Sequence, residues 1–376
     1  MKNTFLNGDL EEEVYMDTPL GFDGNYDSKV CKLRKSLYSL KQSPKACFDK
    51  FTQSAKKQGY KQGETDHTLF VKFSSGGKIA ILIVYVDDII FPGDDLIEMD
   101  RLKRSLATKF EIKDLGSLKY FLGMEVARSK KGIVVSQMKL GDSDKKVPVD
   151  TTRYQRLVGK LIYLSHTQPD IAFAVSVVSQ FMHSPYEKHL EVVYQILRYL
   201  KSTPGKGLFF MKNEQRGVEA YTDVDWFGLV TDRRSTTGYY TFVWGNLVTW
   251  RSKKQSVMAR SSAEAEFSAM SHGICEMLWL KRVLEELRQP IEGTMKLYCD
   301  NKAAISIAHN PIQHDKTKHV EIDRQSIKEK LETGVLCMPF VPTTQQIANI
   351  LTKGLIKPNF EFLTSKLDMI DIYAPT

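Results

Sequence analysis

Cysteine is scarce in this sequence and forms no recognisable pairs. The five cysteines are an odd number and lie far apart: Cys31, Cys47, Cys275, Cys299 and Cys337. No two of them have the Cys-x-x-Cys spacing of a zinc ribbon, and an odd count does not suit a disulfide framework. The sequence therefore argues against both, and it favours a protein of a reducing compartment.

Long hydrophobic runs are also missing. The longest apolar run spans residues 79–86, whereas a membrane-spanning helix needs about 20 residues. The first residues, Met1 to Gly8, lack the apolar core of a signal peptide. We therefore expect a soluble, intracellular protein that does not engage membranes.

Composition places the chain among ordinary globular proteins. Its 376 residues are 42% hydrophobic and 26% charged, which excludes a collagen-like, coiled-coil or wholly disordered chain. At ~150 residues per domain, the length suggests about two domains. The formal net charge of +8 suits a polyanionic partner, although many soluble proteins share such an excess.

The most informative local pattern is a pair of adjacent acids between two apolar segments. Residues 79–86 predict a strand buried on both faces, Asp87 and Asp88 follow it, and residues 89–91 predict a second strand. Adjacent carboxylates repel each other and lose hydration when buried. A Mg²⁺ ion, which prefers hard oxygen ligands, would offset that cost. The dipeptide alone is more typical of an exposed turn.

The string Tyr85-Val86-Asp87-Asp88 resembles the polymerase signature of reverse transcriptases. Three further strings extend the resemblance to the Pol polyproteins of Copia-type LTR retrotransposons, close to plant elements. Residues 5–16 are similar to the opening palm motif, residues 36–44 to the template- and nucleotide-binding helix, and residues 120–125 to the primer grip. The resemblance implies that Asp87 and Asp88 are catalytic and hold metal ions. The residues that it implies for nucleotide, template and primer contact are Phe5, Lys41, Gln42, Leu122 and Gly123.

The second half of the chain predicts a series of helices and strands. Helical periodicity covers residues 154–165, 171–182 and 190–200. A long helix over 261–287 begins at a capping box of Ser261 and Glu264. The remaining predicted elements are strands over 218–222, 239–244, 247–251, 295–299 and 334–341, a type II′ turn at Gly245-Asn246, and a helix over 343–353.

This half resembles the ribonuclease H domain of the same family, in which four carboxylates hold two Mg²⁺ ions. Asp223, Glu266 and Asp300 match the first three acids as catalytic and metal-binding residues. Glu266 is preferred to Glu264 because an Ala-Glu-large apolar string carries the helix acid in these domains. Asn349 stands where the fourth acid is expected. Without the resemblance, each acid would be interpreted as a surface residue or a helix cap.

Together these patterns predict an α+β fold. We expect an incomplete reverse-transcriptase palm over residues 1–128 and an abbreviated, mostly helical thumb or connection over 129–216. An α/β ribonuclease H-like domain is expected over 217–356, and a C-terminal tail over 357–376.

The resemblance implies a fragment of an RNA-directed DNA polymerase with ribonuclease H. Such a protein performs two-metal phosphoryl transfer with Mg²⁺ or Mn²⁺, with two ions per active site in the intact family. The implied partners are RNA, DNA, RNA–DNA hybrid and dNTPs. The implied location is a cytoplasmic virus-like particle or the nucleus.

The chain also departs from the family pattern, and the departures predict impaired catalysis. The first palm Asp is expected one position ahead of Met1, so we expect an N-terminally truncated palm that does not extend primers. The segment after Gln137 is shorter than in the family, and Asn349 brings no charge to the ribonuclease site. The alternative to an impaired enzyme is a non-catalytic remnant that at most binds nucleic acid.

Overall fold

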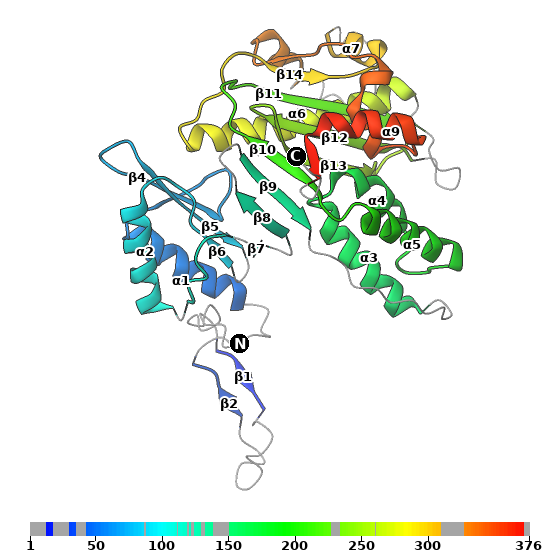
Figure 1. The fold of residues 1–376 in the computed structure, drawn as a ribbon. Helices are drawn as coiled ribbons and strands as arrows, with labels where there is room; N and C mark the ends of the chain where they lie inside the picture. The colour runs from blue at the N-terminus through cyan, green and yellow to red at the C-terminus, as the bar shows by residue number, and fades with distance from the viewer. Residues whose placement is uncertain are drawn as a thin grey trace. The chain divides into compact units, whose positions relative to one another are not determined.

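The computed structural model describes residues 13–17, 30–34, 43–85, 88–110, 112–118, 120–121, 124–128, 132–137, 150–226, 234–259, 261–309 and 327–371. By its internal contacts the chain forms two units, residues 1–118 and 119–376, whose elements are labelled in Figure 1. No helix within the described ranges has the length and apolar character needed to cross a lipid bilayer. Six predicted site residues lie outside these ranges: Phe5, Lys41, Gln42, Asp87, Leu122 and Gly123.

The first unit contains an antiparallel sheet in the order β3-β4-β5-β6. Two helices, α1 and α2, pack their apolar side chains against it. The strands are β3 (Lys61–Gln62), β4 (Leu69–Phe73), β5 (Ile79–Tyr85) and β6 (Asp88–Ile90), and the helices are α1 (Ser43–Lys57) and α2 (Leu96–Lys109). A separate pair of short strands consists of β1 (Tyr15–Met16) and β2 (Cys31–Lys32).

The hairpin predicted around the acidic pair is present, but its first strand is buried on one face only. Tyr85 pairs with Asp88, so the chain reverses between them. Ala80, Leu82 and Val84 are buried in the cluster formed with α1 and α2, whereas the alternate isoleucines of β5 are half-buried. The prediction of two buried faces is therefore wrong, because both helices pack on the same face of this antiparallel sheet.

The second unit contains the three predicted helices of the central region. They are α3 (Thr151–Ser165), α4 (Ala172–Ser179), which follows the 3-10 turn η2 (Pro169–Ile171), and α5 (Glu187–Ser202). An antiparallel sheet has the order β16-β10-β9-β8-β7. Its strands are β7 (Tyr120–Phe121), β8 (Met124–Arg128), β9 (Gly132–Gln137), β10 (Lys206–Met211) and β16 (Met369–Asp371). The expected tail thus contains α9 (Lys357–Thr364), η5 (Ser365–Leu367) and a strand of this sheet.

A second sheet of this unit has the order β13-β12-β11-β14-β15 (Figure 1). The first three strands are antiparallel neighbours, whereas β14 and β15 run parallel to β11. The strands are β11 (Val218–Asp225), β12 (Thr236–Val243), β13 (Asn246–Lys254), β14 (Met295–Tyr298) and β15 (Leu336–Cys337). The helices are α6 (Ser262–Glu286) and α7 (Lys302–His309). The Ser261 hydroxyl accepts from the Glu264 backbone N–H, which confirms the predicted start of α6.

Two local predictions for this unit are wrong. The loop of the β12–β13 hairpin is Trp244-Gly245, with φ of 53° and 76°, and positive φ at both positions is type I′ geometry. Asn246 is already the first residue of β13. The predicted helix over 343–353 is replaced by two 3-10 turns, η3 (Thr343–Gln345) and η4 (Ile347–Leu351), because Gln346 between them has extended backbone.

Both faces of the second sheet are closely covered at β11 and β12. Consecutive strand residues point to opposite faces. On one face, α6 approaches so closely that a Cβ added at Gly273 would lie 2.7 Å from the methyl group of Thr222. On the other face η4 packs on Gly238, the cross-strand partner of Asp223. A Cβ added there would lie 2.6 Å from the Cβ of Leu351. These contacts fix α6 and η4 against the strand that carries Asp223.

Gly238→Ala is expected to lower the free energy of unfolding by about 1–3 kcal/mol, because the new methyl overlaps Leu351 and the Thr352 methyl. Gly159→Ala is the matched control. An added methyl at Gly159 meets no atom within 4 Å, and Ala favours the interior of α3 by roughly 0.5–1 kcal/mol. Urea unfolding of both variants measures the difference. Equal stabilities would contradict the close packing of η4 on β12.

Candidate functional site

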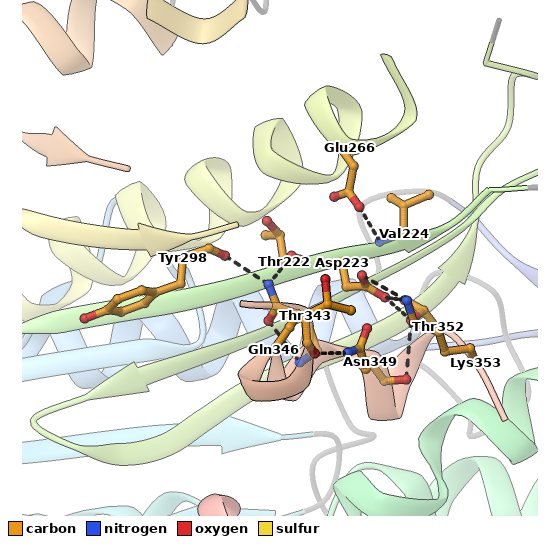
Figure 2. Close-up of polar contacts among 11 residues, drawn as sticks. Thr222, Asp223, Val224, Glu266, Tyr298, Thr343, Gln346, Asn349, Thr352 and Lys353 are labelled. Atoms are coloured by element: carbon orange, nitrogen blue, oxygen red, sulfur yellow. Dashed lines mark hydrogen bonds and ion pairs between the residues drawn. The ribbon is translucent and has the colours of Figure 1, made fainter. Parts of the chain in front are cut away.

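Asp223 lies in β11 and is only 1% exposed. Its side chain points to the face covered by η4, where Thr352 Oγ1 donates a hydrogen bond to Oδ2. Lys353 Nζ lies 3.3 Å from Oδ2 and 3.4 Å from Oδ1. Figure 2 shows both partners approaching the carboxylate from the segment that follows η4. Among the described residues, one ammonium group, that of the partly exposed Lys353, compensates the charge of Asp223.

Glu266 approaches the end of β11 from the first turns of α6. The residue is only 5% exposed. Its carboxylate oxygen Oε1 accepts a hydrogen bond from the Val224 backbone N–H at 3.3 Å (Figure 2). Its other carboxylate oxygen, Oε2, is buried and has no hydrogen-bond partner within the described residues. A buried carboxylate oxygen without a donor is costly unless something else compensates it.

Asp300 is the second residue after the end of β14 and is partly exposed. One of its carboxylate oxygens, one from Glu266 and the Sγ of Cys299 all lie within 4.8 Å of one another. The negative charges of Asp223 and Asp300 both act on Glu266. The structure therefore brings together the three acids that the sequence resemblance selected from distant segments. It also adds Cys299, for which the sequence offered no signal beyond its position next to Asp300.

The acids of this cluster are held in surroundings that oppose their negative charge. Burial raises the pKa of Glu266 above its usual value, and the charges of Asp223 and Asp300 raise it further. Burial also raises the pKa of Asp223, against the opposing effect of the Lys353 ammonium group. Carboxylates in such surroundings favour either a bound proton or a nearby cation.

Asn349 lies in η4 and is 4% exposed. Its Nδ2 donates to the Thr343 carbonyl at 2.8 Å, and its backbone carbonyl accepts from Thr352 Oγ1 at 3.4 Å. Thr352 in turn contacts Asp223, so Asn349 belongs to the same polar network (Figure 2). Its Oδ1 is buried and lacks a partner among the described residues.

Gln346 is a structural residue of the site that the sequence did not reveal. It is fully buried, and its Nε2 donates to the backbone carbonyls of Thr222 at 2.9 Å and Tyr298 at 3.4 Å (Figure 2). These carbonyls belong to β11 and β14, the strands that lead to Asp223 and Asp300. One amide therefore ties the turn that carries Asn349 to both strands.

The carboxylate oxygens of the site suit a hard divalent cation such as Mg²⁺ or Mn²⁺. Such ions take carboxylate and carbonyl oxygens, and the orphaned Oε2 of Glu266 is an oxygen that needs a compensating charge. Asp223, Glu266 and Asp300 are the residues that would hold the cation. Asn349 Oδ1 adds a neutral oxygen nearby, and the partly exposed Asp300 opens the cluster toward solvent.

Of the residues predicted for the polymerase site, only Asp88 lies within the described ranges. Asp88 is the first residue of β6 and is exposed. Asp87 lies outside the described residues, as do the nucleotide, template and primer-grip positions. The structure therefore shows the hairpin of β5 and β6 on which Asp88 lies. The catalytic and binding roles of the polymerase residues remain predictions.

Comparison with known proteins finds a family that matches the first part of the chain and relatives that are similar along most of its length. The family described as reverse transcriptase (RNA-dependent DNA polymerase) matches residues 1–144. The retrovirus-related Pol polyprotein from transposon RE1 of Arabidopsis thaliana is 36% identical over 394 residues, covering 98% of this chain and 27% of that protein. A putative transposon Ty5-1 protein of Saccharomyces cerevisiae is 31% identical over 304 residues, covering 73% of this chain and 98% of that protein.

Among solved structures, LC11-RNase H1, isolated from compost by a metagenomic approach, is similar to part of the chain. It is 16% identical, covers 37% of this chain and 94% of its own, and has a TM-score of 0.28.

The family match over residues 1–144 and the mixed helices and sheets agree with the α+β fold class predicted from the sequence, in which a reverse-transcriptase part comes first. The chain spans about a quarter of the length of the plant Pol polyprotein that it matches. Its identity to that polyprotein extends across nearly all of the 376 residues. The chain belongs to the family of retrovirus-related Pol polyproteins of Copia-type LTR retrotransposons.

Proposed function

We propose that the ribonuclease H-like part of this chain hydrolyses the RNA strand of an RNA–DNA hybrid, at a low rate and with a divalent cation. The observation that supports the proposal is the convergence of Asp223, Glu266 and Asp300 from two strands and a helix. Acids that are separated by 43 and 34 positions along the chain (266 − 223 and 300 − 266) meet at one end of one sheet. A buried, unpartnered Glu266 oxygen lies among them.

Each residue of the cluster has a proposed task. Asp223, Glu266 and Asp300 hold the cations, and Asp300 presents the site to the substrate because it is the most exposed of the three. Bound cations would polarise the scissile phosphate and activate water. Lys353 neutralises Asp223 when no cation is there, and it must release the carboxylate when one binds. Asn349 supplies an oxygen without charge, so the site has three negative charges where the family has four.

A non-catalytic remnant that at most binds RNA, DNA or hybrid is the second candidate for the whole chain. Two contacts favour that alternative. Lys353 occupies both oxygens of Asp223, and the Asn349 amide is engaged with the Thr343 carbonyl.

Cleavage of a labelled RNA strand in an RNA–DNA duplex tests the proposal. We expect slow cleavage that is faster with Mn²⁺ than with Mg²⁺, because Mg²⁺ demands near-ideal octahedral geometry and gives up its waters reluctantly. A chelator should abolish the reaction, and the same RNA without its DNA strand serves as the substrate control. Cleavage that persists in the chelator would contradict the proposed chemistry. Hybrid binding without any cleavage in either metal would instead support the non-catalytic alternative.

A further inference from the structure

The acid cluster contains a thiol that the proposed hydrolysis does not use. Cys299 Sγ, a carboxylate oxygen of Glu266 and one of Asp300 lie within 4.8 Å of one another. This separation is small enough for all three atoms to contact one ion. The inference that follows concerns the same site as the proposed function, but it is tested by metal binding rather than by hydrolysis.

The position of the thiol follows from strand geometry. Met295 and Leu297 of β14 point into the core beneath α6, and Cys299 continues their alternation. The residue is fully buried, and its Sγ accepts from the Asn301 backbone N–H at 3.3 Å. Asp300, the next residue, is partly exposed. Glu266 descends from α6 onto the same face of the sheet, which brings its carboxylate to the sulfur.

A second observation, an unpartnered oxygen of Glu266, indicates that the cluster binds a ligand. Glu266 is more than nine-tenths buried, and its Oε2 has no donor in the part of the chain that the structure describes. A cation that contacts this oxygen would satisfy it. The Cys299 sulfur lies within 4.8 Å of a Glu266 carboxylate oxygen, so the same cation could contact both groups.

The mixture of donors decides which cation is favoured. Ions such as Mg²⁺ take oxygen ligands, whereas Zn²⁺ accepts Cys sulfur together with carboxylate oxygen, and soft thiolate ligands select thiophilic metals. We propose that Glu266, Cys299 and Asp300 form a centre that captures a thiophilic divalent cation, Zn²⁺ or Cd²⁺. On binding, the thiol S–H bond is broken, its proton passes to the buffer, and the thiolate coordinates the ion without any change of oxidation state.

The competing interpretation is that Cys299 is a small apolar residue of the core, which is the usual role of a buried cysteine. The two interpretations differ in one measurable property. A core cysteine contributes nothing to metal affinity, whereas a ligand cysteine contributes a thiolate–metal bond with its own spectrum.

Titration of the full chain with Cd²⁺, in competition with a chelator, distinguishes them. We expect one tightly bound Cd²⁺ per chain with an ultraviolet thiolate-to-cadmium charge-transfer band. Cys299→Ala should remove that band and weaken Cd²⁺ binding by at least about tenfold, the lower end of what even supporting residues of metal sites contribute. Cys275→Ser is the matched control, because Cys275 lies exposed on α6, and it should leave both the band and the affinity unchanged.

Glu266→Gln separates a three-ligand centre from a lone thiol. This variant retains the sulfur, and its thermal unfolding is followed to establish that the fold is intact. It should weaken Cd²⁺ binding by at least about tenfold while a weaker charge-transfer band remains at saturating Cd²⁺. Unchanged affinity in a folded Cys299→Ala or Glu266→Gln protein would overturn the proposal. Because no substrate is present, a hydrolysis assay that fails leaves this result intact, and the two proposals can fail independently.

Discussion

Glu266→Gln is expected to reduce cleavage of the RNA–DNA hybrid by at least about 100-fold. The substitution removes one of the three remaining negative charges, and charge stabilisation by a bound metal contributes several kcal/mol to such reactions. Each ~1.4 kcal/mol corresponds to a factor of ten in rate. The amide oxygen of Gln can still accept from the Val224 backbone N–H. The raised pKa of Glu266 means that the protonated acid, which Gln resembles, is already favoured without metal. Stability should therefore change little.

Glu264→Gln is the matched control for this loss. Glu264 is two residues away on the same helix, and its backbone N–H binds the Ser261 hydroxyl at the start of α6. Glu264 is only partly buried. The same chemical change there should alter the cleavage rate by no more than about twofold, because substitutions away from the site have small effects. Initial rates with saturating Mn²⁺ measure both variants. If Glu264→Gln abolished cleavage and Glu266→Gln did not, the choice between these two acids would be wrong.

Asn349→Asp is expected to raise the rate of hybrid cleavage by about tenfold or more, equivalent to ~1.4 kcal/mol. The new carboxylate restores a fourth negative charge beside Asp223, so it should hold the cation more tightly and stabilise the developing charge of the transition state. Without metal the variant should be less stable by about 1–3 kcal/mol, because Asp cannot donate to the Thr343 carbonyl. Adding Mn²⁺ should recover that stability, since a ligand that binds only the folded state stabilises it.

Gln345→Glu is the control for a charge added in the wrong place. Gln345 lies on η3 and is exposed, so the same change from amide to acid falls close to the site without entering it. Its cleavage rate and its response to Mn²⁺ should equal those of the unmodified chain. Thermal unfolding with and without Mn²⁺, together with initial rates, checks both variants. An Asn349→Asp protein that folds but gains neither activity nor metal-dependent stability would show that position 349 is not the fourth ligand.

Long elements with strong periodicity could be predicted from the sequence. The start of α6 followed from Ser261 and Glu264, and the hairpin after residue 79 followed from an apolar run that meets two acids. These predictions depend on local chemistry. The wrong predictions concern segments whose backbone conformation depends on packing against residues that are distant in the sequence. The hairpin turn lies at Trp244-Gly245, one residue before the predicted Gly245-Asn246. The segment that begins at Thr343 forms 3-10 turns because it packs against Gly238 and because Gln346 donates to a backbone carbonyl of β11.

The site could be predicted only in part, for a related reason. Asp223, Glu266 and Asp300 were selected by resemblance, since no spacing rule connects acids on separate elements. Lys353 and Cys299 were not selected, because their importance depends on which way a strand or turn presents them. Lys353 reaches Asp223 from the turn after η4, and Cys299 reaches Glu266 through the alternation of β14.

The pairing of β16 with β10 has a consequence for the order in which the chain is synthesised. Lys206, Gly207 and Leu208 of β10 bond to residues 369–371, while the other edge of β10 bonds to β9. Pairings between residues so far apart in sequence form slowly. A nascent chain therefore emerges from the ribosome with the free edge of β10 exposed until residue 371 is made. A ribosome that stalls, or a protease that cuts, before that point leaves an open strand edge that other chains can join, which is a route to aggregation.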